Sequence, residues 1–256
     1  MAKKRQVPVR PVQAPRRHED RRARPTLPQL PSWAWIAGGA AALVVIVGAI
    51  VAATSGGSSP PPLPLESTST LGPLKAAPAP GPNGPESVPI PKAKPLAPVG
   101  ALAPGQTVDG ITCEPIEQLA YHIHAHLTIF VNGTQRLIPD GIGIAPPRQG
   151  ENTSAGFFVT NGGCFAWLHT HASDGIIHIE SPSAKTYTLG DFFDIWHQPL
   201  GPNHVGPATG RVVAFYDGKY YNANPRTIPL RPHAQIQLDV GKPLDAPEHI
   251  SFPNGL

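Results

Sequence analysis

The sequence predicts a mainly β domain over residues 109–256, a sandwich or barrel of short antiparallel strands with one short helix. Three observations predict it. Short apolar and β-branched runs recur through this part of the chain, turn residues separate them, and a single segment begins with a helix-start signal. Turns every 8–12 residues or so are typical of sandwiches and barrels. We expect three segments before it: a disordered basic tail (1–32), a transmembrane helix (33–54) and a disordered Pro-rich linker (55–108).

The charge is distributed unevenly along the chain. Residues 1–32 hold nine Lys/Arg and two acidic residues, which gives +7, whereas residues 109–256 hold eight and thirteen, which gives −5. A basic tail beside an apolar segment is a topology signal in membrane proteins, so we expect the tail in the cytoplasm. Because the folded part is acidic, nucleic acid is not an expected partner.

Residues 33–54 contain no charged side chain and are rich in Gly, Ala, Val, Leu and Ile. About 20 such residues in a helix cross the hydrocarbon core of a membrane. Trp33 and Trp35 stand next to the basic tail, where indole rings favour the headgroup layer. We expect a single-pass signal anchor in the cell membrane and an extracytoplasmic C-terminal domain. Cleavage of a signal peptide near Ala53 is the alternative.

Residues 55–108 have low complexity, with Ser-Gly-Gly-Ser-Ser, Pro-Pro-Pro and repeated Ala-Pro and Lys-Pro. Proline fixes φ and removes a backbone donor, so this composition favours polyproline II and open coil. We expect a solvated spacer between the membrane and the domain.

The clearest strand is Tyr121–Val131, where histidines and Thr128 alternate with Ile, Ala and Leu. This alternation is typical of a half-buried strand. Asn132-Gly133 then predicts a type I′ turn, and residues 135–138 return as the second strand of a hairpin. The other segments that we expect to form strands are 157–160, 165–171, 176–180, 211–216, 220–221 and 234–240.

One segment has the signals of a short helix. Thr188 followed by Asp191 forms a capping-box pattern, and the apolar run from Leu189 to Trp196 ends before Pro199. The pattern predicts one helix over residues 189–196.

Histidine is the most informative residue type in this chain, because ten of its eleven histidines lie in the domain. Residues i and i+2 of a strand project from one face about 6.8 Å apart, so two imidazoles at this spacing can converge on one ion. Six histidines have such spacings or lie on an expected neighbouring strand. The predicted metal ligands are His122, His124, His126, His169, His171 and His178. Glu180 and Asp174 are the predicted acceptors for imidazole N–H groups.

The two cysteines are Cys113 and Cys164, and the only methionine is Met1. Outside the membrane, a pair of cysteines predicts a disulfide, which would tie the two histidine segments together. Thiolate ligation of copper is the alternative. Copper(I) carriers commonly use thioether or thiolate ligands, so their scarcity favours Zn²⁺ or Cu²⁺ over Cu⁺.

Four sequence runs resemble an uncharacterised family of bacterial membrane-anchored, histidine-rich extracytoplasmic domains. They are Tyr-His-Ile-His-Ala-His-Leu (121–127), Trp-Leu-His-Thr-His (167–171), Ile-Ile-His-Ile-Glu-Ser-Pro (176–182) and Tyr-Thr-Leu-Gly-Asp-Phe-Phe-Asp-Ile-Trp (187–196). The resemblance covers most of residues 113–256. It implies an extracytoplasmic location and the extent of the domain, but no activity.

Three functions follow as hypotheses. The first is a membrane-anchored domain that binds Zn²⁺ or Cu²⁺ for capture, buffering or delivery. The second is a metal-dependent enzyme with an open metal position, in which Glu180 or Asp174 carries the proton. The third is a metal-free envelope scaffold or adhesion domain. Phe192, Phe193 and Trp196 on the short helix would then form its partner face, although we expect them to pack in the core. No catalytic residue, substrate or protein partner is predicted.

Overall fold

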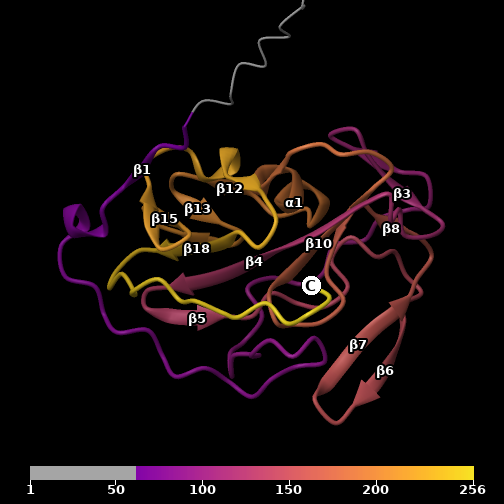
Figure 1. Cartoon of the computed structure of the whole chain (residues 1–256), viewed down its shortest axis with the longest axis horizontal. Coiled ribbons are helices and arrows are strands. Elements are labelled where there is room, and N and C mark those ends of the chain that lie inside the picture. The colour runs from indigo at the N-terminus through magenta and orange to yellow at the C-terminus, as the bar shows by residue number, and fades with distance from the viewer. Residues whose placement is uncertain (1–61) are drawn as a thin grey trace, which may run out of the picture. The chain divides into compact units, whose positions relative to one another are not determined.

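The computed structural model describes residues 62–256. The predicted basic tail, the predicted transmembrane helix and residues 55–61 of the predicted linker lie outside this range. Within it, no helix has the length and apolar character that crossing a membrane requires. The predicted mainly β fold is confirmed, with one α-helix among the described residues (Figure 1).

A central eight-stranded sheet carries the fold, and it is mixed rather than wholly antiparallel as predicted. Its parallel pair is β18 with β4, in which Gln235 lies beside His126. The strands in spatial order are β1 (Leu65–Glu66), β16 (Lys219–Tyr221), β15 (Val212–Tyr216), β18 (Gln235–Val240), β4 (Tyr121–Val131), β10 (Ile176–Ser181) and β9 (Leu168–His169), and β5 (Thr134–Arg136) pairs with β4.

The turn after β4 follows from its sequence. Asn132 and Gly133 both have positive φ, 50° and 68°, as a type I′ turn requires. Val131 therefore pairs with Thr134, and β5 returns along β4. The predicted hairpin is confirmed, although β5 ends at Arg136 rather than continuing to Ile138.

Smaller sheets and turns surround the central sheet. The hairpin of β6 and β7 stands at the lower right of Figure 1. Within residues 62–256, the four small sheets consist of β2 (Thr107–Val108), β3 (Ile111–Glu114) and β8 (Phe165–Ala166); of β6 (Gln149–Thr153) and β7 (Gly156–Asn161); of β11 (Tyr187–Thr188) and β17 (Pro229–Leu230); and of β12 (Leu200–Gly201), β13 (His204–Val205) and β14 (Ala208–Thr209). The 3₁₀ turns are η1 (Thr68–Leu71) and η2 (Pro225–Thr227).

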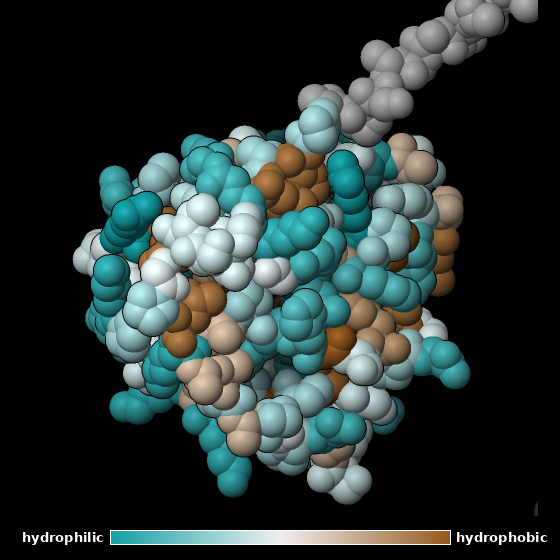
Figure 2. All heavy atoms as spheres, turned by 60° about the vertical axis from the view of Figure 1, so that its left-hand side comes forward, coloured by the Kyte–Doolittle hydropathy of each residue, from teal (hydrophilic) through white to brown (hydrophobic). Residues whose placement is uncertain are grey.

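One face of the central sheet is apolar and forms the core. Alternate residues of β4 and β10, such as Leu127 and Ile179, are buried on it together with the aromatic side chains of α1 (Leu189–Ile195). On the molecular face in Figure 2, by contrast, hydrophilic residues dominate and apolar ones form small separate patches. Phe192, Phe193 and Trp196 are fully buried, which confirms the expected core packing and excludes the alternative of a partner face on this helix.

The helix α1 begins with the predicted capping box. The Thr188 hydroxyl accepts a hydrogen bond from the Asp191 N–H at 3.2 Å, and the Asp191 carboxylate accepts one from the Thr188 N–H at 2.8 Å. We expect Thr188→Ala to lower the free energy of unfolding by about 1 kcal/mol, because the N–H of Asp191 loses its partner. Urea denaturation measures this loss. The exposed turn residue Ser154 supplies the control, since Ser154→Ala should change stability by less than about 0.5 kcal/mol.

The opposite face of the sheet combines polar side chains of β4, β10 and β18 with an apolar cluster of Val213, Phe215 and Leu244, and two segments cover it. We call residues 62–108 the strap and residues 241–256 the C-terminal segment; they appear in indigo to purple and in yellow in Figure 1. Three alternate residues of β18 each accept a backbone N–H from the C-terminal segment. The acceptors are Gln235, Gln237 and Asp239, and the donors are Ile250, Glu248 and Asp245. The polar side chains of β18 thereby have hydrogen-bond partners in the C-terminal segment.

The strap differs from the open coil that its composition predicts. Leu96 donates its N–H to Leu137 O, and Leu137 donates to Lys94 O. The Lys75 ammonium contacts Asp245 at 3.2 Å, and Val88 is fully buried. Proline prevents regular pairing within such a segment, but it leaves carbonyls and apolar surface that can pack against another element. Residues 62–108 therefore belong to the folded domain.

Candidate metal centre

The predicted ligands meet on the polar face of the sheet, where three neighbouring strands align them. In the register, His178 of β10 stands between His124 of β4 and His169 of β9, so three imidazoles form one row across the sheet. Two residues further along β10, Glu180 stands opposite His122 of β4. His178 thus lies on a strand that neighbours the strand of His169, as expected from the sequence.

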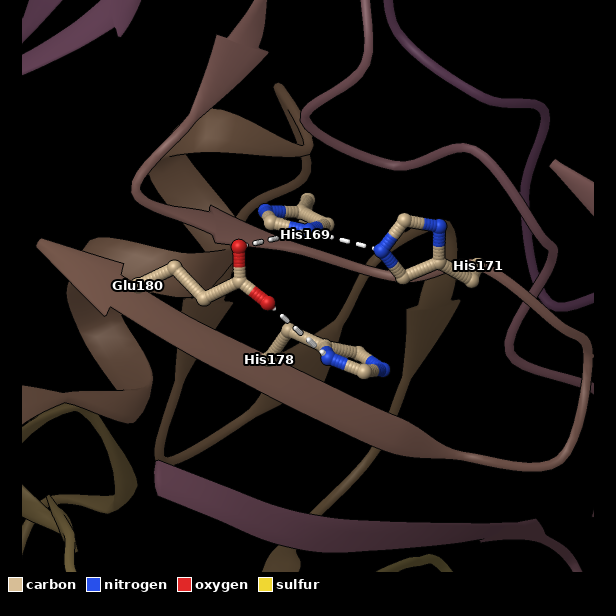
Figure 3. Close-up of side chains that lie close together, drawn as sticks. All are labelled: His169, His171, His178 and Glu180. Atoms are coloured by element: carbon tan, nitrogen blue, oxygen red, sulfur yellow. Dashed lines mark hydrogen bonds and ion pairs between the residues drawn. The ribbon is translucent and has the colours of Figure 1, made fainter. Parts of the chain in front are cut away.

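A buried group contains His169, His171, His178 and Glu180 (Figure 3), with one ligand atom from each within 4.8 Å of the others. The Nε2 atoms of His169 and His171 are 3.0 Å apart. The Glu180 carboxylate lies 3.8 Å from His169 Nε2 and 3.4 Å from His178 Nδ1. Glu180 thus lies among the histidines, where it can itself be a ligand. The sequence predicts it only as an acceptor for imidazole N–H groups.

The backbone fixes which nitrogen of His169 and His171 is free. His169 donates Nδ1–H to Ala166 O at 2.8 Å, and His171 donates Nδ1–H to Val159 O at 2.6 Å. A carbonyl only accepts, so each Nδ1 carries the proton and each neutral ring has a lone pair at Nε2. Burial, followed by the neighbouring imidazoles, lowers the pKa of both rings, which keeps them neutral. Two lone pairs therefore face each other across 3.0 Å.

A second group contains His122, His124 and His178. The His124 Nε2 atom lies 3.0 Å from His122 Nε2 and 3.1 Å from His178 Nδ1. His122 is the exposed member of this group, and the other two are buried. Burial, followed by the adjacent His178, lowers the pKa of His124 to about 3. This ring is therefore also a neutral donor of electron pairs near pH 7.

Two glutamates that the sequence did not point to contact the cluster. Glu86 of the strap accepts from His178 Nε2 at 2.7 Å, and Glu117 lies 3.4 Å from His171 Nε2. Burial alone would lower the pKa of His178, but its contacts with Glu180 and Glu86 outweigh burial and raise that pKa to about 9. Glu86 lies in a segment of linker composition and Glu117 has no motif around it, so neither carried a signal in the sequence.

His126 and Asp174 lie apart from both groups. His126 continues the alternation of β4, but it pairs with Ile176 and donates Nε2–H to the backbone carbonyl of Asp174 at 2.9 Å. Asp174 therefore contacts an imidazole through its backbone carbonyl and not through its carboxylate. Burial, followed by the nearby Glu86 carboxylate, raises the pKa of the Asp174 side chain to about 8.

The predicted disulfide is present between Cys113 and Cys164. Cys113 lies in β3, which pairs with β8, and Cys164 lies five residues before His169. Because both sulfurs are bonded to each other, the alternative of thiolate ligation to copper is wrong. The bridge fixes the chain on the approach to His169 and His171.

A cavity of about 580 Å³ opens onto the cluster. Its wall includes His122, His124, His171, Glu117 and Phe158, and it continues along residues 85–87 of the strap and 253–256 of the C-terminal segment. Phe158 stacks on His171 with ring centroids 4.8 Å apart. The cluster is therefore reached from outside through a lined opening, on the side of the exposed His122.

Comparison of the chain with models of protein families, with curated proteins and with solved structures finds no match.

Proposed function

We propose that this chain is a membrane-anchored, extracytoplasmic protein that binds Zn²⁺ or Cu²⁺ through its histidine cluster and captures, buffers or delivers the ion. The single observation that supports metal binding most directly is the pair of Nε2 lone pairs on His169 and His171, 3.0 Å apart. Two acceptors repel each other at this distance, and a cation between them removes the repulsion. Backbone acceptors on the opposite ring nitrogens are a recurring feature of metal-binding histidines.

The spacing suits a transition metal. Ligand nitrogens about 2.0–2.1 Å from a tetrahedral zinc ion are about 3.3 Å from each other. The pairs His169–His171 and His122–His124 are both 3.0 Å apart, so small rotations of the rings admit an ion. Imidazole and carboxylate ligands favour Zn²⁺ and Cu²⁺, whereas thioether and thiolate ligands favour Cu⁺. The cysteines are engaged in the disulfide, which supports the divalent ions.

Metal content tests this proposal. The full chain, purified in detergent without a histidine tag, is dialysed against Zn²⁺ and Cu²⁺ together and analysed by inductively coupled plasma mass spectrometry. We expect at least one ion per chain to remain after extensive dialysis into metal-free buffer. A folded chain that retains no ion would contradict the proposal and favour a metal-free scaffold.

A variant with one alanine in each histidine pair should lose the most bound metal. We expect His124→Ala with His171→Ala to abolish metal retention, because each of the two groups loses a ligand. His204 and His249 lie outside both groups, so His204→Ala with His249→Ala is the matched control and should retain metal at the wild-type level. Equal retention by the two double variants would show that the metal is bound elsewhere.

The affinity should depend on pH through one proton. His178 has its pKa raised to about 9 by Glu180 and Glu86, so binding of a metal to this ring releases a proton below that pH. We expect the apparent affinity for Zn²⁺ to rise about tenfold per pH unit between pH 6.5 and 8.5. The same proton stabilises the metal-free fold. This stabilisation is complete below about pH 6.5 and is lost as the pH rises through 9.

Competition with a chromophoric chelator at several pH values measures this slope. A slope near zero would show that His178 keeps its proton when zinc binds. A slope of two or more would show that a second ring of the cluster is protonated in the metal-free protein.

The cavity supports a second candidate function, a metal-dependent enzyme. Glu117 lines the cavity 3.4 Å from His171 Nε2, and burial raises its pKa, which suits a group that exchanges protons. This function needs a metal position open to an outside ligand. Substitution with cobalt(II) tests it, because added azide changes the visible spectrum of an open site and leaves that of a closed site unchanged.

A further inference from the structure

We propose that the cluster is a two-metal centre, in which one ion is held by His169 and His171, a second by His122, His124 and His178, and Glu180 bridges the two. This inference rests on the proposed function and adds the number of ions and their connection.

The two histidine pairs are too far apart for one ion. The atoms within each group lie within 4.8 Å of one another, but the groups are separate and share only His178. His122 and His124 lie on β4, His169 ends β9, and β10 lies between these strands. The nitrogens that share a tetrahedral zinc ion are about 3.3 Å apart, whereas no set of ligand atoms within 4.8 Å of one another includes both pairs. In this arrangement an ion bound to one pair therefore leaves the other pair free.

Glu180 stands where a bridging ligand is needed. Its Oε1 atom lies 3.1 Å from His122 Nε2 and 3.4 Å from His178 Nδ1, while its Oε2 atom points to His169 Nε2 at 3.8 Å (Figure 3). The two oxygens of one carboxylate thus face different histidine pairs. The Oε2 atom is buried and has no hydrogen-bond partner among the described residues. Carboxylates commonly connect paired ions about 3.5–4 Å apart, the separation found in two-metal sites.

The charge around the cluster also suits two divalent ions. Besides Glu180, the carboxylates of Glu86 and Glu117 contact imidazoles of the cluster at 2.7 Å and 3.4 Å. Glu86 and Glu180 are buried and Glu117 is partly exposed, so the cluster gathers negative charge in a largely buried place. Buried carboxylates require compensating cations, because the protein interior solvates them poorly.

The two positions differ in exposure. All four members of the group around His169 are buried, whereas the group around His122 includes one exposed ring beside the cavity. His171 and Glu180 of the first group also line this cavity, so both positions are reached from it and the second is the more exposed. We therefore expect the second ion to exchange with solvent faster than the first.

Zinc stoichiometry tests the inference. The full chain is loaded with excess Zn²⁺, passed through a gel-filtration column and analysed for zinc and protein. We expect two zinc ions per chain in the wild type, and one in each of two variants, His122→Ala with His124→Ala and His169→Ala with His171→Ala. Circular dichroism checks that both variants are folded.

Copper(II) tests the bridge independently of stoichiometry. Two bridged Cu²⁺ ions couple magnetically, so the wild type loaded with two ions should show an electron paramagnetic resonance signal well below its copper content. Each variant that lacks one histidine pair (a half variant) should bind one Cu²⁺ ion and give a resonance signal that accounts for all of its copper. Glu180→Gln should bring the signal of the two-copper protein back toward its copper content. An uncoupled wild-type signal from two ions would overturn the bridge.

The outcomes separate the two proposals. No zinc in the wild type contradicts metal binding itself. One zinc per chain in the wild type leaves metal binding intact and overturns the two-metal centre. Two zinc ions in either half variant also overturn it, because the second ion must then be bound outside the histidine pairs.

Discussion

A chain with Cys113→Ala and Cys164→Ala is expected to unfold with a free energy about 4 kcal/mol smaller than that of the wild type. The bridge closes a loop with a sequence separation of 51 residues, and breaking it returns that loop-closure entropy to the unfolded chain. Alanine is the replacement because both cysteines are fully buried and a serine hydroxyl would be left without a partner. Urea denaturation followed by tryptophan fluorescence measures the loss.

The wild type treated with a reductant under the same conditions is the comparison for that variant. The two should lose stability to a similar extent, since both lack the covalent link. A loss below about 1 kcal/mol in the double variant would mean that the unfolded chain stays compact without the bridge, so that little entropy is regained.

Gly143→Ala is expected to lower stability by about 3 kcal/mol and zinc affinity at least about tenfold. Gly143 has a φ of 73°, and a Cβ atom there would lie 2.2 Å from the Leu168 carbonyl oxygen and 3.1 Å from the Cα atom of His169. These are backbone atoms of β9, so the methyl group can be accommodated only by displacing the strand that carries His169. Thermal unfolding and a zinc competition titration measure the two effects.

Gly105 is the matched control for this substitution. Its φ of 75° is nearly the same, but no atom lies within 4 Å of the position of a Cβ. Gly105→Ala should therefore cost about 1–2 kcal/mol for the backbone conformation alone and leave zinc affinity unchanged. Equal effects of the two substitutions on zinc binding would contradict the role of close packing against β9.

Much of the strand pattern could be predicted because local signals decide it. The alternation of Tyr121–Val131 and the Asn132-Gly133 turn give β4 and the start of β5 without tertiary information. The helix is likewise given by Thr188 and Asp191. The parallel pairing of β18 with β4 was not predictable, because it joins segments about a hundred residues apart and depends on how the whole sheet assembles.

The candidate site was predictable for the histidines and not for the acids that contact them. Spacing at i and i+2 marks His122, His124, His169 and His171. His126 has the same spacing, but the register places it beside Ile176, where its Nε2–H donates a hydrogen bond to the backbone carbonyl of Asp174. Glu86 reaches His178 only because the strap crosses the sheet, and composition describes a segment by itself without showing which surface it covers.

The two-residue strand β1 has a consequence for self-association. It completes the edge of the central sheet, where Leu65 and Glu66 pair with Tyr221 and Tyr220 of β16. Without it, the outer backbone groups of β16 would be open to strand addition by a second copy, the route by which edge strands aggregate. A chain shortened past Glu66 should therefore form larger species as its concentration rises, which light scattering detects.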